Sequence, residues 1–594
     1  MGEYTDLIER NWTPHETPQA LPVGKCHIHP ATGPHAVSSS LPSWDYVIAW
    51  SQKDKALLDS VDYSYPRFFI GKPLRALITR VRERLQISED AISCMVFPSS
   101  QMADYCMRML KVLCPQPIPE LHSARFFLPH DPKPNDGASK RIGFSVVLSP
   151  TDVKKQAMGV WMDTGAGMST RHAELCVKMV DFLASDSSSS SLQTPAPLKY
   201  PGNITLDSLF SDAPGDLHDL QARVAQLTTS ERRGLRPVKA EDVLICPTGM
   251  NAIFVASEAL AMMSPDSEVV AYGWLYPETV HVLRKSPWCR VVSFKWGTDD
   301  ELDELEAMLT SPGHQITALF CELPSNIKFI SPNLQRIRSI ADRHNLIVAC
   351  DETAGNFINL DILPYVDMIL SSLTKMFSGA SDVTGGSIVV NPNSCHYDAI
   401  RRSLSTHYSS VHCFPSDIAA LKRNSANMAN RVHKANSNAL AVINVFQQHP
   451  SVEHVNHASL GPTSLHYEKV RRRDGGYGNV LSVVFRNLKA AQCFYDSLDV
   501  CKGSSFGTNF TIAIPYVQLA CYWTQDKCEK YGLPRHIIRI SVGLENPVGI
   551  CRKMSLALEQ VERLEEMEAD QGTTERFKGM GFLAGRQAVA VGRF

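Results

Sequence analysis

Short apolar runs alternate with longer segments of helical periodicity through the central part of the chain. Apolar runs of this length, bounded by turn residues, are typical of buried strands. Strands that alternate with helices form a mainly parallel sheet with helices on both faces, and ligands bind at the carboxyl ends of its strands. The pattern therefore predicts an α/β fold. The expected strands lie at residues 269–272, 291–294, 317–321, 346–350, 368–371 and 387–390.

The same patterning divides the chain into four parts. We expect an N-terminal region at 1–237 with an inserted α/β segment, and a large domain at 238–395 that holds the parallel sheet. A smaller α+β domain is expected at 396–570, and a flexible tail at 571–594. Within the N-terminal region, a serine-rich stretch of low complexity at about 184–200 predicts a mobile loop.

The C-terminal part has its own pattern of elements. A long helical stretch at about 415–448 is followed by strand-like runs at 480–485 and 537–541, and then by an amphipathic helix at about 548–567. The residues from 571 onward are rich in glycine and basic side chains and show no periodicity, so we expect this end to fray.

Composition limits the classes of function. The chain has 594 residues, 44% of them hydrophobic, and a formal net charge of -2, which gives no basic surface for nucleic acid or anionic lipid. No apolar span of about 20 residues and no signal peptide is seen, and the 16 cysteines are scattered, so we expect reduced thiols and a cytoplasmic location. Two histidine-containing snippets, at 26–29 and 407–413, lack zinc-site spacing, and no metal is predicted.

Lys375 stands directly after one of the apolar runs, and hydroxyl side chains precede it. A lysine amine at the end of a buried strand can form a Schiff base with an aldehyde cofactor, and the hydroxyls of Ser372 and Thr374 can donate to the phosphate of that cofactor. A lysine after a strand is more commonly a solvated loop residue, so the run needs support from other segments.

Three segments supply that support. Asp351 ends another apolar run and can pair with a protonated pyridine nitrogen, although an aspartate there can also cap a helix. Gly249 and Met250 follow a further run at the start of a helix, where backbone amides bind phosphate; an ordinary glycine turn is the alternative. Tyr276 lies at a strand-to-helix junction and can lie flat on a pyridine ring.

Taken in this order, the motifs resemble the pyridoxal-phosphate enzymes of cysteine and methionine metabolism, and most closely the long fungal type of cystathionine γ-synthase. The resemblance runs from about residue 41 to about residue 560. It implies pyridoxal 5'-phosphate as cofactor and the aspartate aminotransferase-like (type I) transferase fold. The motifs that carry it include Tyr65-Pro66-Arg67, Thr248-Gly249-Met250, Glu322-Leu323-Pro324-Ser325-Asn326, Asp474-Gly475-Gly476-Tyr477-Gly478 and Arg539-Ile540-Ser541-Val542-Gly543-Leu544-Glu545.

The resemblance also implies roles for single residues. Asn326 would hydrogen-bond the ring oxygen of the cofactor, and Thr353, two residues after Asp351, belongs to the same cofactor-binding set. Arg539 would clamp the carboxylate of an amino-acid substrate, and the backbone of Ser505 would help hold it.

Tyr65 and Arg67 correspond to a pair that reaches across a dimer to the phosphate of a neighbouring subunit. The resemblance thus implies a homo-oligomer, dimer or tetramer, with shared active sites. About 180 residues separate Arg67 from Gly249, more than is usual. Between them, residues 89–100 look like a degraded copy of residues 241–250 that lacks the glycine, so we place the working phosphate site at Gly249.

The implied reaction is γ-replacement on an O-acylhomoserine, with O-acetylhomoserine expected as the substrate and L-cysteine as the nucleophile, to give cystathionine for methionine supply. Two alternatives stay open: the same chemistry with sulfide, an amine or a carbon nucleophile in specialised metabolism, and a catalytically silent binding or regulatory homologue. Retention of Lys375, Asp351, Tyr276 and Arg539 together argues against the silent homologue.

Overall fold

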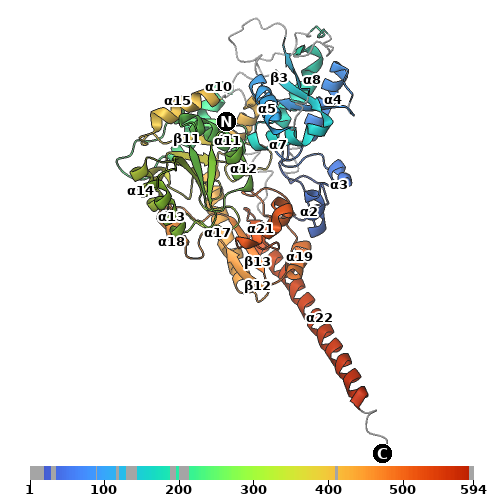
Figure 1. The fold of residues 1–594 in the computed structure, drawn as a ribbon. Helices are drawn as coiled ribbons and strands as arrows, with labels where there is room; N and C mark the ends of the chain where they lie inside the picture. The colour runs from blue at the N-terminus through green and yellow to red at the C-terminus, as the bar shows by residue number, and fades with distance from the viewer. Residues whose placement is uncertain are drawn as a thin grey trace, which may run out of the picture.

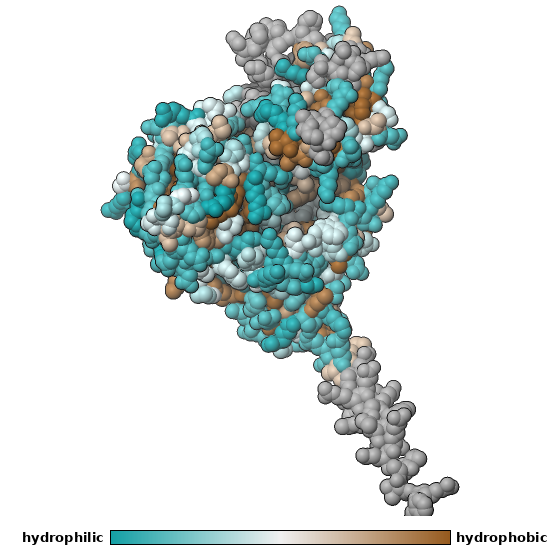
Figure 2. All heavy atoms as spheres, viewed as in Figure 1, coloured by the Kyte–Doolittle hydropathy of each residue, from teal (hydrophilic) through white to brown (hydrophobic). Residues whose placement is uncertain are grey.

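Three separate β-sheets organise the structure, a computed structural model, and a long helix projects from the C-terminal end (Figure 1). The structure describes residues 19–27, 35–88, 90–114, 120–128, 143–187, 196–199, 213–408 and 413–587. Figure 2 shows that the face in this view is mainly hydrophilic, which agrees with the balanced charge of the chain. Within the described ranges, none of the helices is both long and apolar enough to cross a membrane.

The first sheet belongs to the N-terminal domain. Its four strands are antiparallel and lie in the order β1-β3-β2-β4. The strands are β1 (Ile92–Phe97), β2 (His122–Phe127), β3 (Phe144–Pro150) and β4 (Ala184–Ser187). The helices of this part of the chain are α2 (Trp44–Ser51), α3 (Lys55–Ser60), α4 (Lys72–Leu85), α5 (Ser100–Leu113), α7 (Lys154–Thr164) and α8 (Thr170–Met179).

The second sheet has seven strands in the order β5-β11-β10-β9-β8-β6-β7, and all but β11 run parallel. This confirms the predicted α/β fold with a mainly parallel sheet. Its strands are β5 (Val243–Cys246), β6 (Glu268–Tyr272), β7 (Arg290–Phe294), β8 (Ile316–Glu322), β9 (Ile347–Asp351), β10 (Met368–Ser371) and β11 (Gly386–Val390). Its helices are α10 (Ala213–Thr228), α11 (Gly249–Met263), α12 (Pro277–Lys285), α13 (Asp299–Thr310), α14 (Leu334–His344), α15 (Tyr397–His407) and α16 (Pro415–Asn424).

Side-chain alternation along the strands divides the core of this domain between the two faces of the sheet. Ile347 and Ala349 of β9 point into one apolar cluster, which includes α11, α12, α15 and the core around the N-terminal sheet, whereas α2 and α3 pack with the C-terminal domain. Val348 and Cys350 point into the other, which includes α10, α13 and α14. Successive residues of a strand face opposite ways, so a strand buried on both sides is apolar throughout. The N-terminal domain therefore docks over one covered face of the large sheet.

The third sheet belongs to the C-terminal domain and has the order β12-β13-β16-β15-β14. Its strands are β12 (Val452–Asn456), β13 (Val480–Phe485), β14 (Cys501–Lys502), β15 (Ile512–Pro515) and β16 (Ile538–Ser541). The helices are α17 (Met428–Gln447), α18 (Ser464–Glu468), α19 (Leu488–Ser497), α20 (Tyr516–Ala520), α21 (Gln525–Lys530) and α22 (Pro547–Gln587).

Two segments differ from the sequence prediction. Ala184 to Ser187, expected in a mobile loop, form edge strand β4 against β2, because backbone pairing at an edge tolerates polar side chains. Most of the remaining serine-rich stretch lies outside the described residues. The tail predicted to fray from residue 571 is helical to Gln587, since no proline interrupts α22 and each added residue of a helix gains a hydrogen bond.

Candidate active site

Lys375 and Asp351 meet at one edge of the large sheet, as their positions after strands predict. Asp351 is the last residue of β9 and lies opposite Leu370 of the parallel neighbour β10. Lys375 follows β10 by four residues. The carboxyl ends of adjacent parallel strands share one edge, so the amine and the carboxylate enter the same pocket.

The Lys375 side chain is buried among polar and aromatic groups. Its Nζ lies 2.9 Å from the hydroxyl oxygen of Ser505 and 3.5 Å from that of Tyr65. The rings of Tyr65 and Phe506 lie 4.6 and 5.0 Å from it. Burial, then the positive charges of Arg539 and Arg67, hold the pKa of Lys375 well below its usual value, and Asp351 opposes them. The amine is thereby suited to be neutral, as a base or nucleophile must be.

Asp351 is fixed by its neighbour Thr353. One carboxylate oxygen accepts hydrogen bonds from the Thr353 amide at 2.8 Å and from its hydroxyl at 2.5 Å. Burial raises the pKa of Asp351, and these bonds lower it. The Thr353 hydroxyl in turn accepts from the amide of Ser372 at 2.8 Å, so Thr353 links the Asp351 end of β9 to the segment that leads to Lys375.

The predicted phosphate site lies at the start of α11. Thr248 caps this helix by accepting from the Asn251 amide at 3.0 Å, and Gly249 is its first residue. A Cβ at Gly249 would lie 2.7 Å from the Cβ of Ser372, so only glycine permits this approach. The Ser372 hydroxyl is buried, with the Tyr65 hydroxyl as a neighbouring polar group, and Met250 is buried as well. The Thr374 hydroxyl is instead paired with the amide of Gly385, at 3.1 Å.

Arg539 and Asn326 also come together, from elements more than 200 residues apart. Arg539, on β16, donates to the Asn326 side-chain oxygen at 3.1 Å and to the Ser505 carbonyl at 2.9 Å. Its guanidinium lies 4.9 Å from the ring of Phe506 and 5.0 Å from that of Tyr516. Only 5% of Arg539 is exposed, so this fork is a rigid, desolvated site for a carboxylate.

Tyr65 and Arg67 lie in the pocket of their own chain, whereas the resemblance implies that such a pair serves a neighbouring subunit. Arg67 donates to the Tyr276 hydroxyl at 2.5 Å and lies 4.0 Å from Glu278. It also donates to the carbonyl of Met162 at 3.1 Å, so the N-terminal domain holds it in place. The reach across a dimer was implied by the resemblance, whereas the docking of that domain brings the pair to Lys375 of the same chain.

Glu322 is a site residue that was not assigned from the sequence. Its carboxylate accepts from the Tyr276 amide at 2.5 Å and from the Asn326 amide at 3.1 Å, so it positions both. Glu322 ends β8 opposite Asp351, and burial together with that carboxylate raises the pKa of Glu322 to about 8. The sequence did contain a signal for this residue, because Glu322, like Asp351, is an acidic residue directly after an apolar run.

The assembled pocket fits pyridoxal phosphate. Two buried guanidinium groups, those of Arg67 and Arg539, converge on it beside the Lys375 amine, and buried positive charges favour anions such as a phosphate and a carboxylate. The buried Ser372 hydroxyl and the helix start at Gly249 give donors for a phosphate. The fold and the site together define a pyridoxal-phosphate-dependent enzyme with a type I transferase fold.

The chain belongs to the Cys/Met metabolism PLP-dependent enzyme family, which matches residues 228–559. Residues 73–169 match the fungal trans-sulfuration enzyme N-terminal domain. The cystathionine gamma-synthase-like protein ankD of Aspergillus thermomutatus is 42% identical over 91% of this chain and 94% of its own. The cystathionine gamma-synthase of Neurospora crassa is 30% identical over 90% of this chain and 97% of its own.

A solved structure has a similar fold. The cystathionine gamma synthase of Xanthomonas oryzae pv. oryzae, in complex with aminoacrylate and cysteine, superimposes with a TM-score of 0.51. It covers 59% of this chain and 88% of its own, at 19% sequence identity. The recognised family and the predicted fold are thus both confirmed.

Proposed function

We propose that this enzyme replaces the acyloxy group of an O-acylhomoserine, O-acetylhomoserine in the first instance, by the sulfur of L-cysteine to give cystathionine and a free carboxylic acid. The observation that carries the proposal is the position of Ser505, whose hydroxyl contacts Lys375 and whose carbonyl holds Arg539. An amino acid held by its carboxylate at Arg539 would present its α-carbon to the Lys375 amine.

Each residue of the pocket has a proposed part in holding the cofactor. The start of α11 at Gly249 and Met250, Ser372, Thr374 and the arm residues Tyr65 and Arg67 would bind the phosphate. Asp351, oriented by Thr353, would pair with the pyridine nitrogen. Tyr276 would lie on the ring, and Asn326 would bond the ring oxygen. When bound, pyridoxal phosphate supplies an electron sink for charge that develops at the α-carbon.

Lys375 would move the protons. Its lowered pKa lets the neutral amine take the α-proton of the bound substrate. The resulting ammonium can pass that proton on, and the neutral amine so regenerated can then remove a proton at the neighbouring carbon. The carbon–oxygen bond to the acyl group breaks at the γ-carbon, the acid departs as a carboxylate, and the cysteine sulfur forms the new bond there. Arg539 keeps the α-carboxylate fixed throughout.

A different nucleophile is the second candidate. The chain is more similar to a relative named synthase-like than to one named cystathionine gamma-synthase, 42% against 30% identity. The same site would then use sulfide, an amine or a carbon nucleophile. The buried, fully assembled set of Lys375, Asp351, Tyr276 and Arg539 speaks against a silent homologue, which would not need it.

The test offers O-acetylhomoserine with cysteine, sulfide and several amines, and identifies the products by mass. If kcat/KM is highest with cysteine and the product is cystathionine, the proposal is supported. If kcat/KM is higher with another nucleophile, the second candidate function is favoured instead. Borohydride reduction of the yellow holoenzyme should fix pyridoxal phosphate on Lys375. A Lys375→Ala chain is the control, and a label on any other residue of the wild type contradicts the site.

Two further parts of the proposal concern location and assembly. All 16 cysteines are free thiols, as expected of a protein in the reducing cytoplasm. A homo-oligomer of dimer or tetramer size stays a prediction, to be measured by sedimentation.

A further inference from the structure

The N-terminal domain repeats the element order of part of the large domain. In the N-terminal domain, α4-β1-α5 leads through β2 to β3, antiparallel to β1, and then to α7 and α8. In the large domain, α10-β5-α11 leads through the strands β6 to β10 and their helices to β11, antiparallel to β5, and then to α15 and α16. The packing repeats as well: α4 contacts α8 as α10 contacts α16, and α5 contacts α7 as α11 contacts α15.

A short sequence match accompanies this likeness. Asp90 and Cys94 have the spacing of Asp242 and Cys246, although Cys94 lies in the middle of β1 and Cys246 ends β5. Each following helix is capped by a hydroxyl side chain that accepts from the amide three residues on, Ser99 in α5 and Thr248 in α11. The first helical residue is Ser100 in one copy and glycine in the other, so the N-terminal copy lacks the close approach that a phosphate site requires.

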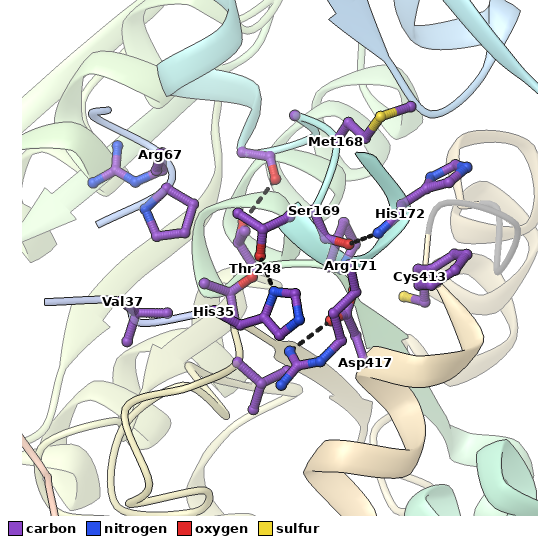
Figure 3. A pocket seen from close by; sticks show the side chains of 18 of the residues that line it. His35, Val37, Arg67, Met168, Ser169, Arg171, His172, Thr248, Cys413 and Asp417 are labelled. Carbon is purple, nitrogen blue, oxygen red and sulfur yellow. Dashed lines mark hydrogen bonds and ion pairs between the residues drawn. The ribbon is translucent and has the colours of Figure 1, made fainter. Parts of the chain in front are cut away.

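The two copies pack against each other through corresponding helices. Tyr105 of α5 meets Phe254 of α11, with ring centroids 5.0 Å apart. Arg171 of α8 pairs with Asp417 of α16 at 3.0 Å, and Figure 3 shows this pair on the wall of a pocket that Arg67 and Thr248 also line. One apolar cluster runs through both copies. Contact between like surfaces is the arrangement of two subunits in a symmetric dimer.

The N-terminal copy also holds parts of the active site. The carbonyl of Gly165 accepts from the Thr248 hydroxyl at 2.8 Å, and the carbonyl of Thr164 accepts from the Asn251 side chain at 2.9 Å. Both bonds fix the start of α11, where the phosphate site lies. The Met162 carbonyl fixes Arg67 in the same way. The N-terminal copy thus positions both the phosphate site and the arm.

We propose that residues 72–187 are a diverged second copy of the cofactor-domain framework, fused into the chain, which takes the place of a partner subunit and completes the active site in cis. In this second copy, Ser100 stands where the phosphate site has Gly249, and no lysine is assigned the part of Lys375. Each chain would therefore have one active site, built entirely from its own residues. This inference rests on the cofactor site proposed at Lys375.

Differently tagged chains, isolated as mixed particles by two successive captures, test the inference. The first mixture pairs the wild-type chain with an Arg67→Ala, Lys375→Ala double variant. We expect the wild-type chain to keep its full activity in it. The second mixture pairs Arg67→Ala with Lys375→Ala. We expect no more activity there than Arg67→Ala has alone. If the chain is a monomer in solution and the monomer is active, the inference is supported without any mixture.

Labelling gives a readout that does not depend on turnover. Borohydride is added at a series of pyridoxal phosphate concentrations, and the measured quantity is the cofactor concentration at which labelling of Lys375 is half-maximal. In cis, Arg67→Ala needs about tenfold more cofactor than the wild type, with or without a Lys375→Ala partner. If the Lys375→Ala partner restores wild-type labelling to Arg67→Ala, the inference is overturned. It is also overturned if the wild-type chain loses activity when it is paired with the double variant. Failure of the wild type itself to label Lys375 would instead sink the proposed site.

A substitution in the N-terminal copy tests its positioning role. A Cβ at Gly165, which has φ +59°, would lie 2.3 Å from the Thr248 hydroxyl oxygen and 2.7 Å from the Asn251 nitrogen. We expect Gly165→Ala to raise the cofactor concentration for half-labelling several-fold. Gly234→Ala is the matched control, because Gly234 also has a positive φ, +91°, but open space around it. Equal labelling by the two variants would remove the positioning role of this loop.

Discussion

Ser505 contacts Lys375 through a hydroxyl that lies 2.9 Å from the amine. Its backbone has φ +85°, a left-handed conformation that is uncommon for a residue other than glycine. Its carbonyl faces Arg539 at the same time. Such strained residues persist where the surrounding structure holds them, commonly at active sites. Ser505 therefore sets the distance between the Lys375 amine and the Arg539 guanidinium.

Removal of the Ser505 hydroxyl should separate its two contacts. Ser505→Ala keeps the carbonyl that holds Arg539 and loses the contact to Lys375, so kcat should fall by about tenfold, the cost of roughly one hydrogen bond, with KM for the amino acid nearly unchanged. Steady-state kinetics with O-acetylhomoserine check this. A raised KM with an unchanged kcat would show that the hydroxyl binds substrate rather than the lysine.

Arg539 should control substrate affinity. A buried, charge-assisted pair with the α-carboxylate contributes roughly 1.5 to 3 kcal/mol, so Arg539→Ala should weaken amino-acid binding at least about tenfold. Arg539→Lys keeps the charge without the fork and should lose less. The cofactor spectrum should be unchanged in both. If Arg539→Ala binds O-acetylhomoserine as tightly as the wild type, the carboxylate clamp lies elsewhere.

Gly249→Ala should weaken cofactor binding. The added methyl would meet the Cβ of Ser372 at 2.7 Å and its Cα at 3.0 Å, so the helix start or the lysine segment must move. We expect the dissociation constant for pyridoxal phosphate to rise about tenfold or more, in an absorbance titration. Gly215→Ala in α10, where a Cβ meets nothing within 4 Å, is the control and should bind normally. Normal binding by Gly249→Ala would place the phosphate elsewhere.

His27 should make the fold sensitive to acid. It is 2% exposed, and burial lowers its pKa from 6.5 to about 3. Between these values the unfolded chain binds a proton that the folded chain does not, so this contribution to stability is lost as pH falls below 6.5, at about 1.4 kcal/mol per pH unit. From pH 7 to pH 5 the wild type should lose roughly 2 kcal/mol more unfolding free energy than His27→Gln. Parallel urea curves for both chains would contradict this.

The sequence predicted what local pattern determines. The apolar runs located the parallel strands to within one or two residues, and Asp351 and Lys375 share a sheet edge because both follow such strands. The resemblance gave Arg539 and Asn326 separate roles in one pocket, but their contact was not predicted, since no local rule joins residues on separate domains.

Other features depended on tertiary contact and were missed. Glu322 was quoted in a motif without a role, because its two amide partners are visible only once β8 and the Tyr276 turn are placed together. The arm was assigned to a neighbour, because sequence separation does not show where the N-terminal domain docks. The degraded copy at residues 89–100 was recognised, yet its antiparallel partner β3 and the repeated helix packing carry no comparable sequence signal.

The placement of Tyr65 and Arg67 beside Lys375 of the same chain has a genetic consequence. In an enzyme whose subunits exchange arms, a defective chain poisons its normal partner, and one bad allele inactivates more than its own share of the product. Here the arm is tethered to its site at a fixed, high effective concentration. An allele that encodes a folded but inactive chain should therefore be fully recessive, and two different inactive alleles of this kind in one cell should fail to complement each other.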